Sequence, residues 1–99
     1  MSVLVTIKAA ADTEQFRRFT ETDGDLMVKI ANDGKAQGAI HHRFGIGDGF
    51  VFVSDEWADA ESFQRFFASE DIATAMQRGG IQGEPEVTIV EAIETPDQF

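Results

Sequence analysis

The sequence contains no cysteine and few basic residues, and both absences exclude classes of protein. Without cysteine there can be no disulfide framework, no thiolate nucleophile and no thiolate metal site, and nothing ties the chain to an oxidising compartment. Lysine and arginine number 8 against 18 aspartates and glutamates, for a formal net charge of -10. Because this charge repels phosphate groups and anionic lipid surfaces, we predict a protein that binds neither nucleic acid nor membranes.

Long hydrophobic runs and a leader-like N-terminus are also absent. No apolar segment approaches the length needed to span a membrane, and residues 1–8 have neither the basic start nor the cleavage site of a signal peptide. We therefore expect a cytoplasmic protein. The 99 residues contain no repeat or linker, which predicts a single domain over residues 1–99. A core this small would gain from association with a second copy.

Hydrophobic patterning predicts four strands, in which branched or aromatic residues alternate with polar ones, over residues 3–9, 39–46, 50–57 and 86–94. The second and third strands flank Gly47-Asp48-Gly49, which tolerates the positive φ of a tight turn, so they should form a hairpin.

Two helices are predicted between these strands. Asp12 is the expected N-cap of the first, which spans residues 13–32 and stops at Gly34. Asp59 is the expected N-cap of the second. Residues 69–71 cap the second helix again before residues 72–76, and Gly79-Gly80 ends it.

The element order is therefore βαββαβ, which predicts a ferredoxin-like α+β fold: one antiparallel sheet with both helices on one face. One strand parity supplies an apolar floor for the helices, namely Val3, Val5, Ile7, Val51, Val53, Val87 and Ile89. The other parity carries Leu4, Thr6, Phe50, Phe52, Thr88, Val90 and Ala92. This second face is too apolar to remain exposed to water as a whole, so we expect a homodimer in which a second sheet covers it.

The segment from Glu56 to Phe63, EWADAESF, resembles the antibiotic biosynthesis monooxygenase-like branch of the dimeric α/β-barrel superfamily. Members of that branch often carry an acid and a tryptophan at the end of the third strand and an aromatic residue early in the second helix. The resemblance implies a homodimer whose sheets close into a barrel, with a pocket between sheet and helices in each protomer. Functions in the superfamily range from cofactor-free oxygenation of aromatic polyketides to haem breakdown, and include members without known activity.

The sequence departs from the haem-degrading members. The resemblance implies that those members use an asparagine on the first strand, together with a tryptophan and an iron-ligating histidine on the second helix. Aligned from Trp57, the two helix positions fall on Phe66 and Met76, and the first strand has no asparagine. Because a thioether is a weak substitute for a proximal imidazole, we predict no haem turnover and no cofactor.

His41 and His42 are the only histidines. Adjacent strand residues project from opposite faces of a sheet, so the two histidines cannot coordinate the same metal ion. We therefore predict no metal site. His42 shares the parity of Ile40 and Phe44 and could enter the pocket as a catalytic acid or base. The alternative is a structural histidine paired with a backbone carbonyl.

Asp23 is the second catalytic candidate, and two interpretations of it stay open. In a continuous first helix it would lie within the apolar stripe, where loss of solvation raises the pKa of a carboxyl and suits it to act as a general base. If Thr22-Asp23-Gly24-Asp25 instead breaks the helix, Asp23 caps a second segment and faces water.

Aromatic and sulfur-containing side chains could wall a cavity for a flat ligand, and the predicted ligand-binding residues are Trp57, Phe44, Phe63, Phe66, Phe67 and Met76. One hypothesis is a homodimer that binds a small apolar or aromatic metabolite between sheet and helices, with cofactor-free oxygenation as its reaction. The other is a non-enzymatic dimeric interaction module whose phenylalanines fill that space. The sequence leaves open whether the chain is an enzyme, because at most two polar residues converge.

Overall fold

Four antiparallel strands form one sheet in the order β2-β3-β1-β4 in the computed structural model, which describes residues 1–99. Its elements are β1 (Val3–Ala10), α1 (Thr13–Thr22), α2 (Gly24–Gln37), β2 (Ala39–Gly47), β3 (Phe50–Trp57), α3 (Ala60–Phe67), α4 (Glu70–Arg78) and β4 (Glu86–Glu91). Central strand β1 pairs with both β3 and β4. The α+β fold is ferredoxin-like, as the sequence predicts. None of the helices is long and apolar enough to cross a membrane.

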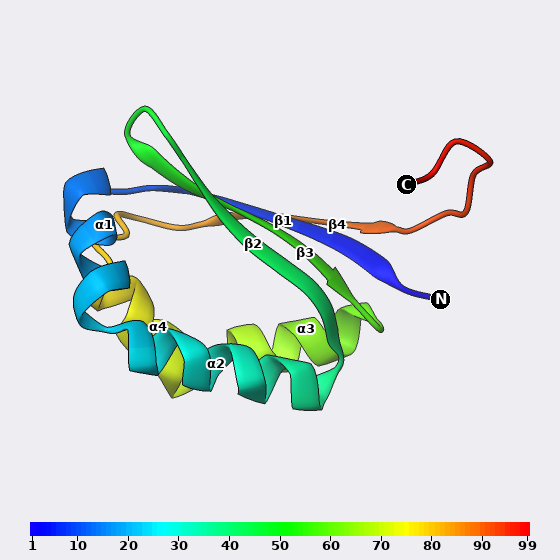
Figure 1. Cartoon of the computed structure of the whole chain (residues 1–99), viewed down its shortest axis with the longest axis horizontal. Coiled ribbons are helices and arrows are strands. Elements are labelled where there is room, and N and C mark those ends of the chain that lie inside the picture. Colours follow the sequence, from blue (N-terminus) through cyan, green and yellow to red (C-terminus); the bar gives the residue numbers. More distant parts are fainter.

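All four helices lie on one side of the sheet, and the opposite face is bare (Figure 1). The predicted strand parity is confirmed at the centre of the sheet, where Val5, Ile7, Val51 and Val53 are buried under the helices. Val87 has the same parity, but it is 40% exposed because it lies on the edge strand β4.

The first predicted helix is two helices. It breaks at Asp23, whose φ of -114° and ψ of 29° leave the helical region, and α2 starts at Gly24. The prediction that Gly34 stops the helix is wrong. Gly34 is buried inside α2, where a Cβ atom would lie 3.4 Å from the ring of Phe66, so this glycine allows close packing. The helix ends at Gly38, whose φ of 126° disfavours other residues.

The second helical region follows the predicted pattern. The Asp59 carboxylate accepts a hydrogen bond from the Ser62 backbone N–H at the start of α3. Ser69 then caps α4, since its hydroxyl oxygen accepts from the N–H of Ile72. Strand β4 ends at Glu91, three residues before the predicted end at Glu94.

Candidate active site

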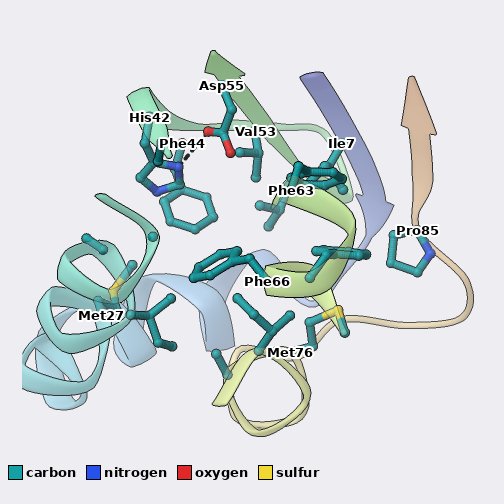
Figure 2. Close-up of a pocket in the computed structure, with 18 of the residues that line it drawn as sticks. Ile7, Met27, His42, Phe44, Val53, Asp55, Phe63, Phe66, Met76 and Pro85 are labelled. Carbon is teal, nitrogen blue, oxygen red and sulfur yellow. Dashed lines mark hydrogen bonds and ion pairs between the residues drawn. The ribbon is translucent and has the colours of Figure 1, made fainter. Parts of the chain in front are cut away.

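A cavity of about 330 Å³ lies between the sheet and the helices. Its lining comes from all four helices and three strands, and Figure 2 shows side chains from these elements surrounding it. The wall is mainly aromatic and aliphatic, with Trp57 and Phe63 from one buried cluster and Phe16 and Phe19 from the other. The space that the predicted fold leaves between its layers is therefore not completely filled by the chain's own side chains.

Three polar side chains form a hydrogen-bonded chain on the sheet side of this cavity. The Asp55 carboxylate binds His42 through Oδ1, at 2.7 Å from the ring Nδ1. Its other oxygen, Oδ2, accepts from the indole Nε1–H of Trp57 at 3.1 Å. Figure 2 shows His42 and Asp55 extending from neighbouring strands toward one another. A single buried carboxylate thus orients both an imidazole and an indole.

Strand pairing produces this arrangement. The register of β2 on β3 places His42 opposite Asp55, and that of β1 on β3 places Val5 on the other side of the same residue. Residues directly opposite one another in a sheet project from the same face, so His42 and Asp55 both point toward the helices. Asp55 is only 8% exposed, yet both of its oxygens have partners, which satisfies the carboxylate away from water.

His42 lies at the mouth of the cavity. Its side chain is 42% exposed, in contrast to that of Asp55. The ring of Phe44 packs against it at 4.8 Å between centroids and 84° between planes. A carboxylate can only accept hydrogen bonds, so a neutral His42 carries its hydrogen on Nδ1 and leaves Nε2 free to accept a proton. This is the orientation that a general base requires.

The six residues predicted to contact a ligand all line the cavity: Trp57, Phe44, Phe63, Phe66, Phe67 and Met76. The aromatic members also pack on one another. The ring centroids of Trp57 and Phe66 are 5.0 Å apart, and those of Phe63 and Phe67 are 5.3 Å apart and stacked. Their part in ligand binding stays a prediction.

Asp23 lies elsewhere. It is absent from the cavity wall, and its carboxylate accepts hydrogen bonds from the Thr22 hydroxyl at 2.9 Å and from the Arg78 guanidinium at 3.0 Å. These two bonds, that from Thr22 first, hold the pKa of Asp23 below its ordinary value of 3.8. The interpretation that required a continuous helix and a raised pKa is therefore wrong, because Gly24 permits the break and Arg78 supplies a cation.

Asp55 is the residue that sequence reasoning missed. The strand parity could have identified it. Asp55 alternates with Val51, Val53 and Trp57, so it lies on the face of the sheet assigned to the helices. An acid at such a position needs buried partners. His42 was identified, but its partner could be found only by combining that parity with the register of the hairpin.

No protein-family model and no curated protein matches the sequence. Solved structures do match it over nearly the whole chain. A candidate antibiotic biosynthesis monooxygenase from Caulobacter crescentus is 14% identical, with a TM-score of 0.71 and coverage of 94% of this chain and 91% of that one. The cofactor-independent oxygenase SnoaB from Streptomyces nogalater is 14% identical, with a TM-score of 0.66 and 98% coverage of both chains.

A further candidate antibiotic biosynthesis monooxygenase, from Deinococcus radiodurans, is 15% identical with a TM-score of 0.67 and 98% coverage of both chains. The chain thus has the ferredoxin-like fold of these antibiotic biosynthesis monooxygenase-like structures, as the segment from Glu56 to Phe63 indicated. At these identities the likeness establishes the fold, and the chemistry must be argued from the site.

Proposed function

We propose that this protein is a cofactor-free monooxygenase that oxygenates a small apolar or aromatic molecule in the cavity beneath its helices. The observation that carries the proposal is the contact between His42 and the buried Asp55 in the wall of an otherwise apolar cavity. That contact supplies a base fixed in one orientation, next to a space in which a hydrophobic substrate can lie.

The substrate must itself provide the electrons, so it needs an acidic C–H bond whose anion is stabilised by adjacent rings. His42 Nε2 removes that proton, and Asp55 stabilises the resulting imidazolium through Nδ1–H. The substrate anion then reduces dioxygen by one electron, and the two radicals combine to form a C–O bond.

Return of the proton from His42 gives a hydroperoxide and restores the neutral imidazole. Loss of water from the hydroperoxide leaves a ketone, so a CH₂ group and one O₂ become a C=O group and one H₂O. The substrate is oxidised, dioxygen is reduced, and the base is regenerated. The protein's own part is to bind the substrate, orient it and move one proton.

Two observations favour this function over the non-enzymatic module with a filled core. The cavity of about 330 Å³ falls within the size range of small-molecule sites, although nine phenylalanines were available to fill it. SnoaB, which has the same fold, is a cofactor-independent oxygenase.

The proposal extends to assembly and location. Leu4, Phe52 and Val90 are 44%, 36% and 49% exposed on the sheet face opposite the helices. An apolar sheet face of this kind favours burial against a second copy, so we propose a homodimer. We also propose that it works in the cytoplasm as a single domain over residues 1–99.

Anthrone tests the reaction, because its CH₂ group lies between two aromatic rings and becomes C=O in anthraquinone. With the purified protein in air, we expect anthraquinone to form above the uncatalysed rate, with one O₂ consumed per product. His42→Gln removes the base and should lower the enzymatic rate by about 10²-fold or more.

Arg43→Gln is the control, since it also places glutamine next to His42 on β2, at a residue that is absent from the cavity wall and whose register partner is Ser54 rather than Asp55. Its rate should stay within about twofold of the unsubstituted protein, because proton transfer requires a base in hydrogen-bond contact. Equal rates for His42→Gln and the unsubstituted protein would rule out His42 as the base.

A further inference from the structure

The cavity wall does not share the acidic excess of the rest of the molecule. Acidic residues make up 18 of the 99 residues of the chain, but only one of the 26 that line the cavity. That one is Asp55, and both of its oxygens already bind His42 and Trp57. The other titratable residues in the wall are Lys35, His41 and His42. A surface with excess negative charge thus surrounds a site without a free carboxylate.

Lys35 is the lysine of this site, and it is exposed to solvent. It lies in the last turn of α2 and takes part in none of the ion pairs of the protein. Lys29, on the same helix, differs in this respect because its Nζ contacts both Asp33 and Asp71. A lysine that lines an apolar cavity and has no acidic partner is available to a ligand.

We infer that the ligand is an amphipathic anion, an aromatic or aliphatic body carrying one carboxylate or phenolate group, and that Lys35 binds this anionic group. The inference rests on the proposed function, for which it specifies the substrate class. The apolar wall accepts the body, while the ammonium group selects the charge. Because the rest of the protein repels anions, a cation at the cavity determines where an anionic ligand binds.

Lysine can also line a cavity only with its hydrocarbon stem, and the test must separate stem from charge. Lys35→Met does so, since methionine keeps an unbranched apolar side chain and forms helices as readily as lysine. Arg17→Met is the matched control: Arg17 is exposed on α1, is absent from the cavity wall and makes no ion pair.

The probes are 2-naphthoate and its neutral isostere 2-naphthamide, titrated calorimetrically into the full-length protein. We expect naphthoate to bind at least about fivefold more tightly at low salt, and Lys35→Met to remove that preference while changing naphthamide affinity by less than about twofold. Arg17→Met should keep the preference.

Each other outcome has a distinct meaning. If both probes bind with equal affinity, or if Lys35→Met weakens both equally, the charge assignment is overturned while the binding cavity of the proposed function survives. A loss of preference in Arg17→Met as large as in Lys35→Met would assign the effect to net charge and overturn the role of Lys35. Failure of both probes to bind would overturn the apolar binding site, and the inference with it.

Discussion

At the scale of a single residue, Asp55 has a structural role toward Trp57 and a positioning role toward His42, and substitutions can separate the two. It accepts a hydrogen bond from the indole of Trp57, which is 1% exposed, and it fixes the hydrogen of His42 on Nδ1. Asp55→Ala leaves the buried indole N–H without an acceptor, which should lower the free energy of unfolding by about 1–3 kcal/mol. Urea denaturation followed by Trp57 fluorescence measures this loss.

Asp55→Asn should preserve the fold and abolish the base. Its amide oxygen can still accept from Trp57, but its NH₂ group donates to His42 Nδ1 and moves the imidazole hydrogen to Nε2. Oxygenation should fall as far as in His42→Gln, while stability drops less than in Asp55→Ala. Nitrogen-15 NMR of the imidazole reports the tautomer directly. An unchanged tautomer combined with full activity would contradict the positioning role of Asp55.

At the scale of the element, side-chain caps at Asp12, Asp59 and Ser69 begin three of the four short helices of the helical layer. Asp59 begins α3, and the hydrogen bond from the Ser62 backbone N–H, followed by that from the Ser62 side chain, holds its pKa below the ordinary value of 3.8. A carboxyl whose pKa is lowered by folding stabilises the folded state above its unfolded pKa, and that contribution disappears as the pH falls through the folded pKa.

Asp59→Asn tests this cap. Asparagine is as good an N-cap as aspartate but does not titrate, so the variant should retain the fold at neutral pH. Between about pH 5 and pH 2, its melting temperature should fall less steeply than that of the unsubstituted protein. Glu61→Gln, an exposed acid in the same turn with an i,i+4 partner at Arg65, serves as the charge control. Parallel pH profiles for Asp59→Asn and the unsubstituted protein would contradict the assigned role.

At the scale of the whole molecule, no layer of the chain covers the face of the sheet opposite the helices (Figure 1). We expect sedimentation at micromolar concentration to show a species of twice the 10.9 kDa chain mass, with an interface above the ~1,000 Å² of specific contacts. Phe52→Asp places a charge on this face and should give monomer or insoluble chain. Burial of an unpaired charge is the physical reason.

Val28→Asp is the matched control for assembly, because Val28 is a 60% exposed apolar residue on α2 rather than on the sheet. It should sediment as the unsubstituted protein does. A 10.9 kDa species for the unsubstituted protein at micromolar concentration would contradict the proposed dimer.

The sequence alone determined the features that neighbouring residues control. Alternation predicted the four strands and the buried faces of β1 and β3, and the short polar side chains of Asp12, Asp59 and Ser69 fixed three helix starts. Each of these depends on contacts within a few residues, so a local pattern is enough to predict them. His42 and the six aromatic and thioether residues of the wall could be predicted in the same way.

The tertiary structure decided what depends on distant residues. Asp55 meets His42, 13 positions away, only through the hairpin register, and Gly34 stays within α2 because Phe66 packs against it. The helix does break at Asp23, but the expected side-chain cap is wrong: the carboxylate makes no capping hydrogen bond to α2 and instead binds Arg78, 55 positions along the chain. Whether phenylalanines fill the space or leave a cavity depends on how the layers pack. Packing and cross-strand pairing combine residues from several elements, which no local pattern specifies.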